Sequence, residues 1–262
     1  MRSLPVSSVR RSAVLTLLIA GAVSLTVPAR SNGSERDARG ALGAARSVPA
    51  AHRSSDDASA PSSADDWRGQ IHDFAETHLQ HTAWGPAHAR RDYEMTLALA
   101  RAEGITVDDD ALYAAAYLHD MGGIPPYARP GVDHGDRSAQ LADSVLRAVG
   151  FPMEKAALAK EIMSHHQYYR PPDTLAVAIL FRDADILDFL GAIDVARIIS
   201  LTTREKIAPD LPHAIDVIRE QMLDMPGRLH TDAAKREGAK RVREMQQFLD
   251  ALSAETDSLR VI

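Results

Sequence analysis

The sequence predicts an all-α protein whose main part is one compact multi-helix bundle. From Trp67 onward, apolar residues recur at intervals of three and four, which is the spacing of an amphipathic helix. Gly and Pro residues interrupt this spacing, and no alternating pattern extends far enough to indicate a sheet. With 262 residues, of which 45% are hydrophobic, the chain is long enough to bury the core of one domain.

Residues 1–29 have the features of an export signal. Three arginines within the first eleven residues precede an uncharged apolar run over 13–27, and Val27-Pro28-Ala29 offers small residues for cleavage. This run is shorter than the roughly 20 residues that a bilayer span requires. We therefore expect cleavage, a periplasmic or secreted product, and no stable membrane span after processing. An uncleaved N-terminal membrane anchor is the alternative.

Residues 30–66 are predicted to be a disordered linker, and residues 67–262 form the predicted domain. The linker consists mainly of Ser, Ala, Gly, Arg and Asp, which bury too little apolar surface to offset the entropy lost on ordering. After residue 66 the chain has 22 basic and 30 acidic residues. A domain with this acidic balance is a poor candidate for wrapping a nucleic acid, which requires clustered positive charge.

Helices are expected wherever the apolar spacing continues between breaking or capping residues. A first helix around Ile71 and Phe74 ends before Gly85-Pro86, and Asp108 caps the start of a third. A loop rich in Gly and Pro over 122–131 separates the third helix from the fourth. The expected helices after the first cover 87–102, 111–118, 138–149, 153–165, 176–198, 211–225 and 231–252.

The candidate functional centre begins with His119-Asp120, at the end of the third expected helix. Gly122 allows the backbone to turn away directly after this pair. An imidazole provides a nitrogen ligand, and a carboxylate can bridge two cations, so the pair suits a metal site. Taken alone, such a pair is common on solvated surfaces, and the interpretation depends on other residues. The chain has no cysteine, which excludes thiolate ligands, disulfides and thiol nucleophiles.

Three carboxylates interrupt an otherwise apolar helix at Asp183, Asp185 and Asp188. Ionised carboxylates in such surroundings are costly unless they are paired or bind a cation. Asp185 and Asp188 share one helix face, whereas Asp183 is rotated by about 200° from Asp185, so the three cannot all ligate one centre. The alternative is a salt-bridged helix that uses Arg182 and Arg197.

Four further histidines are candidate ligands. His88 begins the second expected helix, and His134 lies in a loop just before the fourth. For each of them, a solvent-facing position is the alternative. His165 and His166 end the fifth helix, and adjacent helical side chains diverge by about 100°. We therefore expect one of this pair to be a ligand and the other to contact a ligand or the substrate.

Taken in order, these residues resemble the HD superfamily of metal-dependent phosphohydrolases. The resemblance extends over most of residues 84–252. Its most specific part is the run from Asp183 to Ile193, which is similar to the DAD-x-LD-x-x-GA stretch of a group of mostly uncharacterised HD hydrolases. The other parts are His88 with Arg91, Leu118-His119-Asp120-Met121-Gly122, His134 before Ser138-Ala139, and Ile162 followed by His165.

The resemblance implies an α-helical bundle around a central metal site. His88, His119, Asp120 and Asp185 correspond by position to the four ligands of the family. His134 and either His165 or His166 match the additional histidines of HD proteins that hold two metals. This chain departs from the group by Gly85-Pro86 ahead of His88 and by its predicted export signal.

The implied cofactor is one divalent cation or two, with Mn, Fe, Ni, Co, Zn and Mg all compatible with His and Asp ligands. Two cations about 4 Å apart, bridged by Asp120, could hold a hydroxide. We therefore expect His119 and Asp120 to be catalytic in the hydrolysis of a small phosphorylated substrate, with nucleotides among the candidates. Arg91, Arg129 and Arg170 are candidate phosphate-binding residues, with solvated surface charge as the alternative.

Two other functions are compatible with the same residues. Some HD proteins with additional histidines hold a diiron centre and use dioxygen to cleave phosphonates or cyclitols. A non-enzymatic HD module that acts as a sensor or binding domain is the other alternative. Iron content with oxygen-dependent activity would favour the oxygenase, and the absence of bound metal would favour the binding module.

Overall fold

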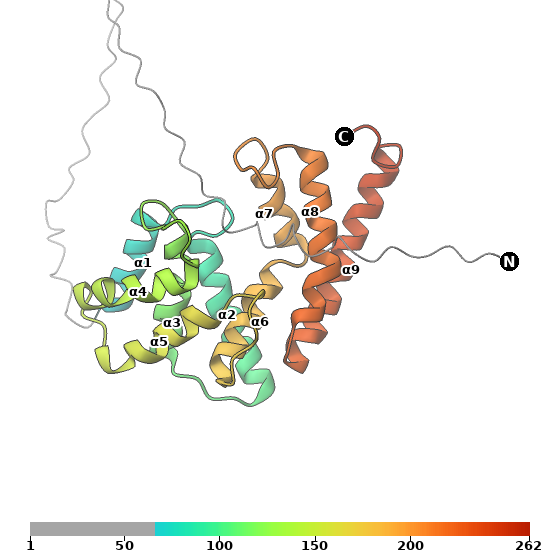
Figure 1. The fold of residues 1–262 in the computed structure, drawn as a ribbon. Helices are drawn as coiled ribbons and strands as arrows, with labels where there is room; N and C mark the ends of the chain where they lie inside the picture. Colours follow the sequence, from blue (N-terminus) through green and yellow to red (C-terminus); the bar gives the residue numbers. More distant parts are fainter. Residues whose placement is uncertain (1–65) are drawn as a thin grey trace, which may run out of the picture. The chain divides into compact units, whose positions relative to one another are not determined.

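The computed structural model describes residues 66–262, and all regular structure in that part of the chain is helical (Figure 1). This confirms the predicted all-α class. The predicted export signal and the linker up to residue 65 lie outside the described residues and stay predictions. Among the helices over 66–262, none combines the length and apolarity that crossing a bilayer requires.

The longer helices follow the expected order along the chain. Short 3-10 turns at Met121–Gly123, Met153–Lys155 and Met225–Arg228 connect some of them. The α-helices are α1 (Trp67–His78), α2 (Pro86–Glu103), α3 (Asp109–Leu118), α4 (His134–Ala148), α5 (Ala156–His165), α6 (Ala176–Asp188), α7 (Ala192–Ser200), α8 (Leu211–Asp224) and α9 (Asp232–Glu255).

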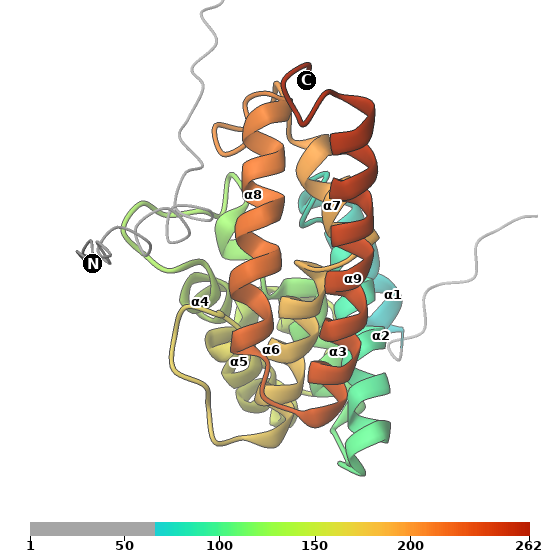
Figure 2. The same ribbon diagram turned by 90° about the vertical axis from the view of Figure 1, so that its right-hand side faces the viewer.

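Helix α6 lies between two hydrophobic cores and packs along α2. Phe181 belongs to the core formed with α1, α3, α4 and α5, whereas Leu180 and Leu187 belong to the core formed with α7, α8 and α9. Figures 1 and 2 show these last three helices side by side. Residues on both faces of α6 are therefore buried, which explains its nearly continuous apolar sequence.

Helix α4 begins four residues earlier than expected, at His134 instead of Ser138. The Asp133 carboxylate accepts hydrogen bonds from the backbone N–H groups of Gly135 and Asp136, which is a typical N-cap. The apolar spacing becomes visible only further along the helix, so sequence periodicity placed the start too late. As a result, the expected loop residue His134 is the first residue of a helix.

The expected single helix over 176–198 was wrong, because the chain forms two helices there. Helix α6 ends at Asp188, and α7 begins at Ala192 after a turn at Gly191. Gly191 has φ of 85°, a left-handed conformation that L side chains rarely adopt. A Cβ atom at this position would also lie 3.1 Å from Cγ of Arg241. The helical spacing of apolar residues continues across Gly191, so the sequence pattern does not reveal that the helix ends there.

Asp183 connects α6 to the start of α9. Its fully buried carboxylate accepts hydrogen bonds from the backbone N–H of His230 at 2.9 Å and of Thr231 at 2.7 Å, and from the Thr231 hydroxyl at 2.7 Å. Thr231 in turn caps α9. Asp183 therefore has a structural role, on the opposite side of the helix from Asp185.

Replacing Asp183 with Ala should lower the free energy of unfolding by about 3 kcal/mol or more, because three buried hydrogen-bond donors lose a charged acceptor. Denaturant unfolding followed by circular dichroism measures the loss. Asp183→Asn keeps one acceptor oxygen and should cost less than Asp183→Ala. Equal stability of wild type and Asp183→Ala would show that this connection contributes nothing.

Candidate metal centre

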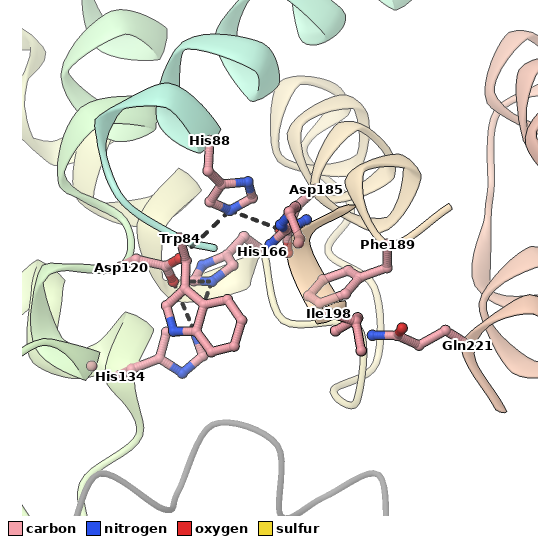
Figure 3. A pocket seen from close by; sticks show the side chains of 11 residues that line it. Trp84, His88, Asp120, His134, His166, Asp185, Phe189, Ile198 and Gln221 are labelled. Atoms are coloured by element: carbon pink, nitrogen blue, oxygen red, sulfur yellow. Dashed lines mark hydrogen bonds and ion pairs between the residues drawn. The ribbon is translucent and has the colours of Figure 1, made fainter. Parts of the chain in front are cut away.

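Imidazoles and carboxylates from five segments converge at one end of a cavity (Figure 3). Each is placed at or near the end of a helix, with the exception of the carboxylate from within α6. The residues at the cavity are His88 near the start of α2, Asp120 directly after α3, His134 at the start of α4, His166 directly after α5, and Asp185 in α6. His119, directly after α3, joins the cluster behind them, with its Nε2 atom 3.3 Å from Asp120 Oδ2.

The backbone orients two of these imidazoles. His119 Nδ1 lies 2.7 Å from the carbonyl oxygen of Ala116, and His166 Nδ1 lies 2.6 Å from that of Met163. A carbonyl oxygen can only accept, so Nδ1 carries the proton in both rings. The Nε2 atom of each ring therefore faces the cluster and, in the neutral ring, presents a lone pair as in a metal-binding histidine.

The side chain of Asp188 orients His88. Its Oδ2 atom accepts a hydrogen bond from His88 Nδ1 at 2.7 Å, which leaves His88 Nε2 facing the cluster. Arg91 forms a bidentate pair with the same carboxylate, and Arg197 Nη1 lies 2.7 Å from Oδ2. Burial alone would raise the pKa of Asp188, but Arg197, Arg91 and His88 hold it well below its usual range. Asp188 thus places a carboxylate, paired with two guanidinium groups, behind the cluster.

The two oxygens of Asp120 face two different groups of nitrogens. Oδ2 lies 3.3 Å from His119 Nε2 and 3.5 Å from His88 Nε2. Oδ1 lies 3.4 Å from His134 Nε2 and 3.8 Å from His166 Nε2. A carboxylate placed in this way can bridge two cations. Burial would raise the pKa of Asp120, but the surrounding imidazoles, His119 foremost, hold it well below its usual range.

The group on the Oδ2 side contains four buried side chains, which are His88, Asp92, His119 and Asp185. One ligand atom from each lies within 4.8 Å of the other three. On the Oδ1 side, Nε2 of His134 and Nε2 of His166 are 2.9 Å apart. This is close to the ~3 Å that separates neighbouring ligand atoms around a cation with bonds of about 2.1 Å.

Unpaired buried atoms indicate that the cluster suits cations. Within residues 66–262, His119 Nε2 and both carboxylate oxygens of Asp92 are buried without a hydrogen-bond partner. An ionised carboxylate in such a place requires positive charge nearby. Burial, the largest influence, raises the pKa of Asp92 to about 8. The donor set of imidazoles and carboxylates therefore fits one or two divalent cations.

The structure separates the two adjacent histidines at the end of α5. His166 is 2% exposed and joins the cluster. The side chain of His165 is 43% exposed, and its Nδ1 atom lies 3.1 Å from Asp173 Oδ2. Helix α5 ends at His165, so the chain is already turning when it reaches His166. Of the two candidates, only His166 is placed to bind a cation with His134.

The three arginines expected to bind phosphate do not line the cavity. Arg91 is held by Asp188, and Arg170 forms a bidentate pair with Asp136 at 2.7 and 3.0 Å. Arg129 is exposed in the loop before α4. The arginine that does line the cavity is Arg197 of α7, which sequence reasoning considered only as a partner for the aspartates of α6.

The cavity has an empty volume of about 470 Å³, part of it open to solvent. Trp84, Phe189, Ile198 and Gln221 of α8 also line the cavity, and Figure 3 shows the last three on the side away from Asp120 and His134. Gln221 is fully buried, and neither of its amide atoms has a hydrogen-bond partner within residues 66–262. The cavity thus has two chemically different ends. One carries the imidazoles and carboxylates that suit cations, and the other is mainly apolar, with the unpaired amide of Gln221 as its polar group.

Comparison with known proteins identifies one family. Residues 87–190 match the family model for the HD domain. This range contains all residues of the two ligand groups, from His88 to Asp185. No curated protein matches the chain significantly.

Several solved structures have a similar fold. A protein from Lactobacillus plantarum is 24% identical, with a TM-score of 0.52 over 73% of this chain and 97% of that one. A predicted HD superfamily hydrolase from an uncultured Thermotogales bacterium is 23% identical, with a TM-score of 0.51 over 72% of this chain and 91% of its own. Bacillus subtilis YpgQ in complex with ADP is 19% identical, with a TM-score of 0.55 over 73% of this chain and 97% of YpgQ. At these identities the likeness shows a common fold.

The pair at the end of α5 allows a matched test of the cation site. His166→Ala should weaken metal binding at least about tenfold, because it removes a buried imidazole of the Oδ1 group, and His165→Ala should leave it unchanged. Metal titration of the metal-free full chain by calorimetry gives both affinities. The opposite ranking would place the ligand at His165.

Proposed function

Residues 87–190 of this chain form an HD domain, and on this premise we propose that the protein is a metal-dependent phosphohydrolase that cleaves a phosphate ester. The observation that carries the proposal is the placement of Asp120, whose two oxygens face two separate groups of imidazole nitrogens. When bound, divalent cations activate a water molecule and neutralise charge on the phosphoryl oxygens.

The residues of the chain would hold and orient these cations. Asp120 would contact both, with His88, His119 and Asp185 on one side and His134 and His166 on the other. Hydrogen bonds from Nδ1 fix the rings of His88, His119 and His166 before any cation arrives, which supports tight and geometrically selective binding.

The substrate we propose is a phosphate ester with an apolar or planar organic group. The phosphoryl group would lie at the cluster, and the organic group would contact Trp84, Phe189 and Ile198. Arg197, whose charge is paired with Asp188, also lines the cavity, and its guanidinium carbon lies 5.0 Å from the centre of the Phe189 ring. The solved structure of YpgQ holds ADP, which supports nucleotides as first candidates, alongside phosphate esters available outside the cytoplasm.

Removing bound metal from the full chain with a chelator should abolish hydrolysis of an aryl phosphate, and adding back one of the candidate divalent cations should restore it. A panel of nucleotides and sugar phosphates then defines the preferred substrate. Bound iron with activity that depends on dioxygen would favour an oxygenase. A purified chain that binds no metal and hydrolyses nothing would favour a binding module.

Asp120→Ala should lower kcat at least about 100-fold, because both cations lose a shared ligand, and circular dichroism should still report a helical protein. The surface variant His165→Ala is the matched control and should keep wild-type activity. Full activity of Asp120→Ala would contradict the assignment of the bridging carboxylate.

A further inference from the structure

We propose that Asp92 is an additional ligand of the cation on the Oδ2 side of Asp120. With Asp92, this side offers two imidazoles and the three carboxylates of Asp92, Asp120 and Asp185. This inference rests on the proposed metal-dependent function and adds a residue that sequence reasoning missed. It also predicts which cation this side prefers.

The backbone of α2 brings Asp92 to the cluster. Asp92 follows His88 by four residues, which is about one helical turn, so both side chains leave the same face of the helix. Its Oδ2 atom lies 3.1 Å from His88 Nε2 and 3.8 Å from His119 Nε2. The side chain is 1% exposed, so solvent does not compensate its charge.

Neither imidazole forms a hydrogen bond to the Asp92 carboxylate. His88 directs its Nδ1 proton to Asp188, and His119 directs its Nδ1 proton to the Ala116 carbonyl. A ring that binds a cation through Nε2 is neutral, so Nε2 then carries a lone pair and cannot donate a proton to Asp92. In that state the Asp92 oxygen and the two nitrogen lone pairs repel one another, unless a cation lies between the three atoms.

No other side chain within residues 66–262 takes the place of a cation. The guanidinium groups of Arg91 and Arg197 are both engaged by Asp188. The hydroxyl of Thr96 donates to the backbone carbonyl of Asp92 and does not reach the carboxylate. Both Asp92 oxygens are buried without a hydrogen bond, which is uncommon in folded proteins. Asp194 shares this property, so the inference rests on the further fact that Asp92 Oδ2 lies 3.1 and 3.8 Å from the Nε2 atoms of His88 and His119.

The additional carboxylate makes the two sides chemically different. The Oδ2 side has more oxygen than nitrogen ligands, which favours cations such as Mn²⁺ that prefer oxygen and high coordination numbers. The Oδ1 side has two imidazoles and one carboxylate oxygen, a set that suits Zn²⁺, Fe²⁺ or Co²⁺. Asp92 would thus direct Mn²⁺ to one side and make it the tighter Mn²⁺ site.

The test compares Asp92→Asn with Asp194→Asn in the metal-free full chain. Asp194 of α7 is a matched control because it is also fully buried with both oxygens unpaired, but it belongs to neither ligand group. Titration with Mn²⁺, followed by electron paramagnetic resonance of the free ion, measures affinity without any substrate. We expect Asp92→Asn to weaken the tighter Mn²⁺ site at least about tenfold and Asp194→Asn to match wild type.

A second measurement tests ligation directly. The Co²⁺ absorption spectrum of the loaded protein depends on the atoms bound to the ion, so it should change in Asp92→Asn and stay the same in Asp194→Asn. If Asp92→Asn does not fold, Asp92→Ser removes the carboxylate with less volume and allows the same titration.

The outcomes separate this inference from the proposed function. Wild-type Mn²⁺ affinity and an unchanged Co²⁺ spectrum in Asp92→Asn would overturn the role of Asp92 and leave the phosphohydrolase intact. A wild-type chain that binds none of the cations would overturn the proposed function itself, and Asp92 with it.

Discussion

The ion network around Asp188 is the interaction on which the site depends. Asp188 is the last residue of α6, and its carboxylate binds His88 and Arg91 from α2 and Arg197 from α7. Arg197 also donates to the backbone carbonyls of Asp188 and Ala83. One buried anion thereby joins three helices and the loop before α2, and it fixes the ring that faces the cavity. Breaking a buried network of this kind is strongly destabilising, because the remaining charges lose their partners.

In front of this network, the chain gathers three carboxylates around the imidazoles of the cluster. Asp92, Asp120 and Asp185 lie close together, and the nearby arginines are already engaged by Asp188. A divalent ion at the proposed site would relieve the repulsion among these carboxylates, so its binding would be coupled to folding. The same charge arrangement supports selective binding, because a cation gains more there than it would on a solvated surface.

Much of this architecture could be predicted from the sequence, and the errors have physical reasons. Helical periodicity located most helices, but it continued across Gly191 and could not reveal the break there. Helix geometry predicted that Asp183 and Asp185 point in opposite directions, which is consistent with the structure. Asp183 there accepts hydrogen bonds from the backbone N–H groups of His230 and Thr231, just before α9. The choice between His165 and His166 depends on where α5 stops, and helix ends are poorly defined by sequence.

The cavity residues were harder to predict because they depend on distant contacts. Arg91 and Arg170 are near candidate ligands in sequence, yet both are engaged by aspartates. Asp92 was not among the candidate ligands, and its burial beside His88 is what distinguishes it. The helical spacing of four between His88 and Asp92 was the available signal.

The turn at Gly191 has a consequence for how proteins with this site can diversify. It ends the stretch that contains the proposed cation ligands, and the chain beyond it provides Ile198 and Gln221 in the wall of the cavity. The proposed cation ligands therefore lie before Gly191 in the chain, whereas these two wall residues lie after it. Substitutions in the later segment can reshape the wall while the chemistry stays intact, so related proteins with the same ligands are free to recognise quite different molecules.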